Sequence, residues 1–157
     1  MDIAQGVCFY RLSNEMASWK NSIIIHASPG QVFAYVDDPM KLVEWIPGLM
    51  AVDDVIGSGA GQQQEFTHKM AGIRLHGQSV VVEHVPNKCA VHQLVGMVHA
   101  TFGYFVEPHD EGTRLTLEVE YSVPIPVLGK LAEHLVIKRN ARELELALVN
   151  VKETLES

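Results

Sequence analysis

The sequence predicts an α+β fold in which a curved antiparallel sheet is covered by one long C-terminal helix. Two observations indicate it. Strand-like segments separated by short turns run from about Gln62 to Val123. An uninterrupted amphipathic helix then follows over about 128–155. Because a curved sheet closed by a helix encloses space, we expect an internal cavity lined by apolar side chains.

The composition is that of one globular domain, with 157 residues, 47% apolar and 20% charged. The formal charge of −7 argues against a nucleic-acid partner, which requires clustered Lys and Arg. The densest basic run, Lys138-Arg139 with Arg142, shares its helix with Glu143 and Glu145, so we interpret it as a solvated helix face. No apolar run approaches the ~20 residues of a membrane span, so no integral membrane segment is predicted.

The two cysteines, Cys8 and Cys89, are not part of a CxxC motif. This usage favours unpaired thiols in a reducing compartment over a disulfide scaffold. The N-terminus lacks a basic region followed by an apolar core, so no signal peptide is predicted. Together these observations predict a cytoplasmic protein.

The first elements follow from local signals. Ser22–His26 is β-branched and predicts a strand. Ser28 is a good N-cap and Pro29 suits the first helical position, so a helix should begin there. A second short helix is expected over Met40–Trp45, ended by Pro47.

The remaining strands are bounded by turn residues. They are expected at Leu49–Ile56, Gln62–Met70, Ile73–Val85, Cys89–Val95, Val98–Glu107 and Arg114–Val123.

Alternation of side chains can be carried from hairpin to hairpin, because turn lengths decide which residues share a face. The inward face then comprises Phe66, His68, Met70, Ile73, Leu75, Ser79, Val81, Glu83, Cys89, Val91, Gln93, Val95, Phe102, Tyr104, Val106, Leu115, Leu117, Val119 and Tyr121. The outward face carries three histidines, His76, His84 and His92. A β-bulge would shift this assignment.

The C-terminal helix has an apolar stripe of helical period that should cover the sheet. It comprises Ile137, Ala141, Leu144, Leu148, Val151 and Leu155, and one further step toward the N-terminus reaches His134.

We predict a ligand site on the inward face. It comprises Phe66, His68, Met70, Leu75, Gln93, Phe102, Tyr104, Leu117, Tyr121, His134, Ile137 and Ala141. His68 lies between apolar neighbours, where an imidazole needs either a ligand or a bond to a Tyr or a buried water. His68, Tyr104 and Tyr121 are also the candidate catalytic residues, as proton carriers. No motif predicts a metal site or a cofactor.

The run Ile-His-Ala-Ser-Pro-Gly-Gln-Val-Phe-Ala-Tyr-Val-Asp-Asp-Pro at 25–39, with Leu42 and the Trp-Ile-Pro-Gly at 45–48, resembles the START-like or polyketide cyclase/dehydrase superfamily. Residues 107–115 resemble its last hairpin. That superfamily includes the birch pollen allergen and proteins related to carbon monoxide dehydrogenase. The resemblance implies a helix-grip fold, with seven strands around a long helix and two short helices after the first strand. It covers residues 21–157 as a ligand-binding domain and leaves 1–20 as an N-terminal extension.

The resemblance and the apolar inner face predict binding or transport of a small hydrophobic ligand, such as a lipid, an isoprenoid or a polycyclic aromatic compound. The alternative is a cyclase or dehydratase. A third hypothesis is a module that docks to another protein through its outer face or through Pro124–Leu128, and a homodimer or a protein partner stays open.

Overall fold

The computed structural model describes residue 8 and residues 18–70, 72–96, 99–121 and 130–157, with the side chains of 130–137 and 140 outside the description. The described elements are β1 (Ser18–Ile25), α1 (Pro29–Asp37), α2 (Leu42–Trp45), β2 (Leu49–Ile56), β3 (Gln63–Met70), β4 (Ile73–Val85), β5 (Cys89–Gly96), β6 (Ala100–His109), β7 (Gly112–Tyr121) and α3 (Lys130–Glu156). The predicted segment Pro124–Leu128 lies outside the described residues.

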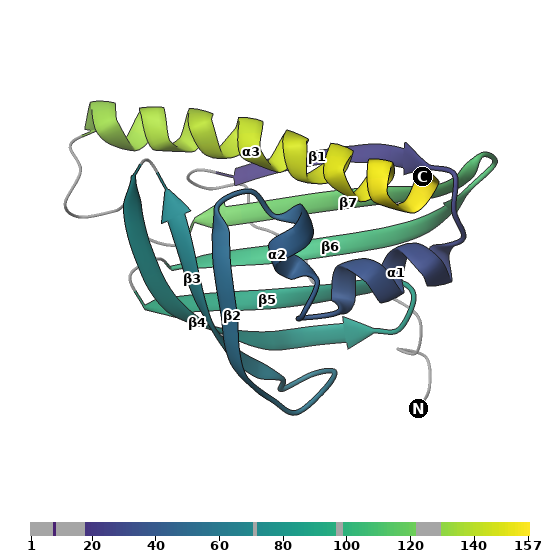
Figure 1. Ribbon diagram of the computed structural model, residues 1–157, viewed down its shortest axis with the longest axis horizontal. Helices are drawn as coiled ribbons and strands as arrows, with labels where there is room; N and C mark the ends of the chain where they lie inside the picture. The colour runs from purple at the N-terminus through teal and green to yellow at the C-terminus, as the bar shows by residue number, and fades with distance from the viewer. Residues whose placement is uncertain (1–7, 9–17, 71, 97–98, 122–129) are drawn as a thin grey trace.

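The seven strands form one antiparallel sheet in the order β1-β7-β6-β5-β4-β3-β2. β1 pairs with β7, the last strand of the chain, so β1 and β2 are the two edges. α3 runs along the sheet and contacts β1 and β7, while α1 and α2 lie on the same face (Figure 1). The predicted fold class is therefore confirmed: a curved sheet with one long helix and two short helices after the first strand.

The local signals for the first helix act as predicted. The side chain of Ser28 accepts a hydrogen bond from the Gln31 amide at 3.2 Å, and the Gln31 side chain accepts one from the Ser28 amide at 3.1 Å. This capping box satisfies amide groups that have no partner within the helix. α2 is shorter than predicted, because the Asp38 side chain accepts a hydrogen bond from the Met40 amide at 3.0 Å and holds that residue in a turn.

The main core lies between the helices and the concave face of the sheet. Its fully buried side chains include Ile25, Val32, Val36, Trp45, Leu115, Leu117 and Val151. Three members of the predicted α3 stripe, Leu144, Leu148 and Val151, are buried here. The stripe therefore does what its helical period predicts, and positions α3 over the sheet.

One part of the predicted face assignment is wrong. Val81 pairs with His92 and Glu83 pairs with Val91, so Val82 is one extra residue on β4. Such a bulge reverses the alternation of side chains beyond it. The predicted inward strand residues Glu83, Cys89, Val91, Gln93 and Val95 face outward instead, whereas the predicted outward residues His84 and His92 face the concave side.

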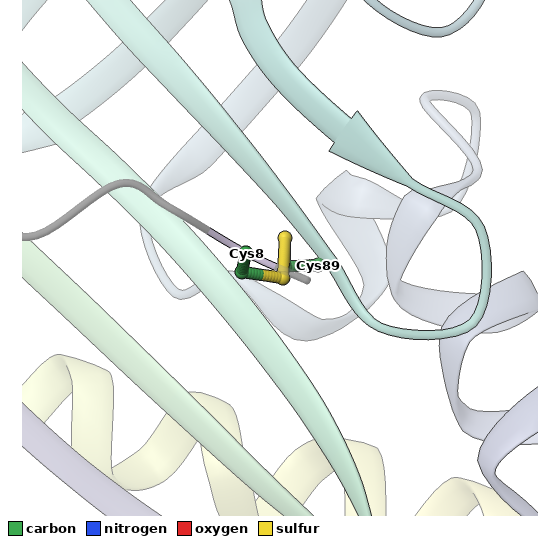
Figure 2. Close-up of a disulfide and its surroundings, with 2 residues drawn as sticks. All are labelled: Cys8 and Cys89. Carbon is green, nitrogen blue, oxygen red and sulfur yellow. A yellow bond between two sulfur atoms is a disulfide. The ribbon is translucent and has the colours of Figure 1, made fainter. Parts of the chain in front are cut away.

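The cysteine prediction is also wrong. Cys89 lies on the outer face of β5 and forms a disulfide with Cys8, with an S–S distance of 2.04 Å (Figure 2). The two positions are 81 residues apart in sequence, so only the fold brings them together. The predicted cytoplasmic localisation loses the support of unpaired thiols and stays a prediction.

We expect reduction of the Cys8–Cys89 bond to lower the free energy of unfolding by about 2–4 kcal/mol, because the bond restricts the unfolded chain. Urea unfolding with and without dithiothreitol measures this loss. A Cys8→Ser variant should not respond to the reductant. Titration of two free thiols in the unfolded, unreduced protein would contradict the disulfide.

Candidate functional site

A cavity of about 130 Å³ lies between the concave face of the sheet and the helices α2 and α3. Its wall is mostly apolar, with side chains that include Phe66, Met70, Leu75, Leu94, Phe102 and Leu144. A few polar side chains also reach it: Gln64, His68, Ser79, His92, Tyr121 and Glu143. An apolar enclosure with few polar groups is the usual composition of a small-molecule site.

The structure brings half of the predicted ligand residues to this cavity: Phe66, His68, Met70, Leu75, Phe102 and Tyr121. Tyr104 and Leu117 are buried in the core instead, and Ala141 is half-buried outside the wall. Gln93 is exposed on the opposite face, so its predicted orientation is wrong. The side chains of His134 and Ile137 lie outside the described residues. A ligand role for the residues that do line the cavity stays a prediction.

Sequence reasoning missed two polar residues of the wall, His92 and Glu143. His92 reaches the cavity only because of the bulge at Val82, which leaves no mark in the local pattern. Glu143 forms an i,i+4 ion pair with Arg139 at 3.4 Å, as a residue on a solvated helix face would. The solvated interpretation is wrong for Glu143, which is half-buried and lines the cavity.

His68 is held by the loop between α2 and β2. Its Nε2 lies 3.0 Å from the carbonyl oxygen of Pro47, and because a carbonyl only accepts, Nε2 carries the hydrogen and donates it. Gly48 makes this approach feasible: it has φ +81°, and a Cβ there would lie 2.6 Å from the Lys69 carbonyl oxygen. One ring nitrogen of His68 is therefore used within the protein, and Nδ1 remains as an acceptor.

A chain of hydrogen bonds runs from the cavity wall to α1. The Tyr104 hydroxyl donates to Asp37 Oδ1 at 2.5 Å, so its oxygen must accept from His92 Nε2 at 3.2 Å. His92 Nδ1 is then an acceptor, and the Ser79 hydroxyl donates to it at 2.9 Å. At the far end, His84 Nε2 donates to Asp37 Oδ2 at 2.8 Å. Every member has a partner, which fixes α1 against the sheet.

Burial keeps the two central groups of this chain neutral. It lowers the pKa of His92 to about 4, although the nearby Asp37 charge raises it in part. Burial, and then the same charge, raise the pKa of Tyr104 well above its ordinary value. Neither group ionises near neutral pH, and acid–base catalysis works best with a pKa near the working pH.

Tyr121 faces the cavity at the end of β7. Burial raises its pKa, and the charge of Glu143 adds to this rise. The Tyr121 hydroxyl therefore stays protonated at neutral pH and presents a neutral polar group to the cavity.

Among the described residues, a set of potential metal ligands comes together at Cys8, Glu83 and Cys89, whose ligand atoms lie within 4.8 Å of one another. The two sulfur atoms are bonded to each other, and it is the thiolate that binds metals. This set lies on the outer face of the sheet, away from the cavity.

The fold and cavity define a helix-grip domain with an internal pocket. The model of the family described as "Polyketide cyclase / dehydrase and lipid transport" matches residues 16–156, and the chain belongs to this family. The resemblance found in the sequence motifs is thus confirmed. None of the described helices has the length and hydropathy needed to cross a membrane.

Solved structures with low sequence identity share the fold. TTHA0849 from Thermus thermophilus is 20% identical, with 88% of this chain and 97% of that chain covered and a TM-score of 0.77. The Aha1 dimer from Colwellia psychrerythraea is 18% identical, with 90% and 97% covered and a TM-score of 0.62. Ara h 8.0201 is 14% identical, with 88% and 97% covered and a TM-score of 0.63. No curated protein matches the chain in sequence.

We expect His92 to make stability depend on pH. Its pKa is about 4 when folded against 6.5 when unfolded, so the unfolded state binds more protons between these values. Its contribution, about 3 kcal/mol, is fully present above pH 6.5 and lost as the pH falls toward 4. Urea unfolding across this range should show a flatter pH profile for His92→Gln, whose amide can keep both hydrogen bonds.

The matched control is His76→Gln, because His76 is exposed on the outer face. It should keep the wild-type pH profile between 4 and 6.5. Equal slopes for His92→Gln and wild type would contradict the assignment of a buried neutral imidazole.

Proposed function

We propose that this protein binds a small hydrophobic ligand in its internal cavity. The observation that carries the proposal is the cavity itself, about 130 Å³ of mostly apolar space between sheet and helices. Family and fold are consistent with hydrophobic ligand binding or with cyclase-like chemistry. Apolar cavities of about 150 Å³ stay free of water and take up benzene. The size thus supports a ring-sized ligand, such as a compact isoprenoid or aromatic compound, better than an extended acyl chain.

The test of ligand binding uses toluene, which is a single apolar ring. We expect saturable chemical-shift changes at cavity residues in a titration followed by ¹H–¹⁵N NMR. Ala100→Met should weaken binding at least tenfold, because Ala100 is fully buried in the wall and a longer side chain there occupies the cavity.

The control is Val82→Met, which adds a similar side chain at an exposed position of β4. It should bind toluene like wild type. Native mass spectrometry of the freshly purified protein, with solvent extraction, tests for a natural passenger. Absence of toluene binding at cavity residues in wild type would overturn the proposal.

A second candidate function is cyclase or dehydratase chemistry with cavity residues as proton carriers. One observation favours it: His68 and Tyr121 reach the same cavity from β3 and β7. Tyr104, the third candidate, lies behind the wall and reaches it only through His92. The neutral state of Tyr104 and His92 weakens this candidate, so binding without turnover is the function that we favour.

If the protein turns over a poly-β-keto thioester, His68→Ala should lower kcat by about 100-fold or more, as loss of a general acid or base does. His76→Ala, on the outer face, should leave kcat unchanged. Circular dichroism checks that both variants fold. Turnover that survives the His68 substitution would exclude His68 as the proton carrier.

A further inference from the structure

The cavity contains one acceptor that the protein leaves without a donor. Glu143 lies on α3 and lines the cavity. Its Oε1 accepts from Arg139 Nε at 3.4 Å, whereas Oε2 is buried and has no hydrogen-bond partner in the part of the chain that the structure describes. A buried polar atom without a partner destabilises the fold and calls for an explanation.

Three polar groups around the cavity do not supply this donor. His68 Nε2 donates to Pro47, the Ser79 hydroxyl donates to His92, and His92 Nε2 donates to Tyr104. These three wall residues have therefore committed their hydrogens within the protein. The occupant of the cavity is left to provide the hydrogen that Glu143 Oε2 lacks.

The neighbours of Glu143 restrict what that occupant can be. Leu144 beside it is apolar, and the Glu143 charge acts on the Tyr121 hydroxyl across the wall. A ligand with an apolar body and one donor group matches this arrangement. A ligand carboxylate has no hydrogen to donate and would place a second acidic group against Glu143.

We propose that Glu143 Oε2 accepts a hydrogen bond from the hydroxyl or amino group of a compact apolar ligand, and that ligands ending in a carboxylate are excluded. This inference rests on the proposed ligand-binding function and names the chemistry of the ligand's polar end. It favours phenols, alcohols and amines over fatty acids.

Three single-ring probes that differ in one substituent test it: toluene, p-cresol and 4-methylbenzoate. We expect wild type to bind toluene and p-cresol and to bind 4-methylbenzoate at least tenfold more weakly than p-cresol. The preference for p-cresol over toluene should fall about tenfold in Glu143→Leu, because that variant removes the acceptor. Comparing this ratio between proteins cancels the difference in hydrophobicity between the two probes.

Glu143→Gln is the conservative variant, since it keeps the shape of the side chain and one acceptor oxygen. It should keep toluene binding and gain affinity for 4-methylbenzoate by about tenfold. Glu145→Gln is the matched control, because Glu145 is exposed on the same helix. It should bind all three probes like wild type.

The outcomes separate the two proposals. If wild type binds no probe, including toluene, the proposed function itself fails. If toluene binds but the p-cresol preference is the same in wild type, Glu143→Leu and Glu143→Gln, a buried water meets the need of Glu143 and the inference is overturned. Binding of 4-methylbenzoate to wild type as tight as that of p-cresol would also overturn it.

Discussion

The extra residue Val82 in β4 decides which side chains the sheet presents to the cavity and which it presents to solvent. Side chains alternate strictly along a strand, so one unpaired residue reverses every position beyond it until the strand ends. Because of this reversal, His84 and His92 both face the helices. Through Tyr104 and Asp37 they tie the end of α1 to the sheet. The same reversal turns Cys89 outward, where Cys8 meets it.

The polar groups of the interior fall into two kinds. The chain from Ser79 to His84 is closed, since each donor has an acceptor and burial keeps His92 neutral. Such a satisfied network rigidifies a core and specifies one arrangement of its elements. Glu143 is different, because its Oε2 remains unpartnered among the described residues. The contrast distinguishes polar groups that serve the fold from one that is available to a ligand.

Much of the fold could be predicted because its signals are local. Ser28 and Pro29 begin α1 through interactions within one helical turn. Turn residues separate the strands, and the period of Leu144, Leu148 and Val151 identifies the face of α3 that packs on the sheet. The side of the cavity formed by β3 and the start of β4 was predictable for the same reason, since alternation holds there without interruption.

The sequence by itself thus determined the elements, their order, and the apolar faces that enclose a cavity, because helix caps, turns and hydrophobic periods act over a few residues. Only the tertiary structure decided three things: the reversal at Val82, the pairing of Cys8 with Cys89, and the entry of Glu143 into the wall. Each depends on contacts between segments far apart in the chain. A bulge changes the parity of a strand without changing its composition, so its effect is visible only once the partner strand is in place.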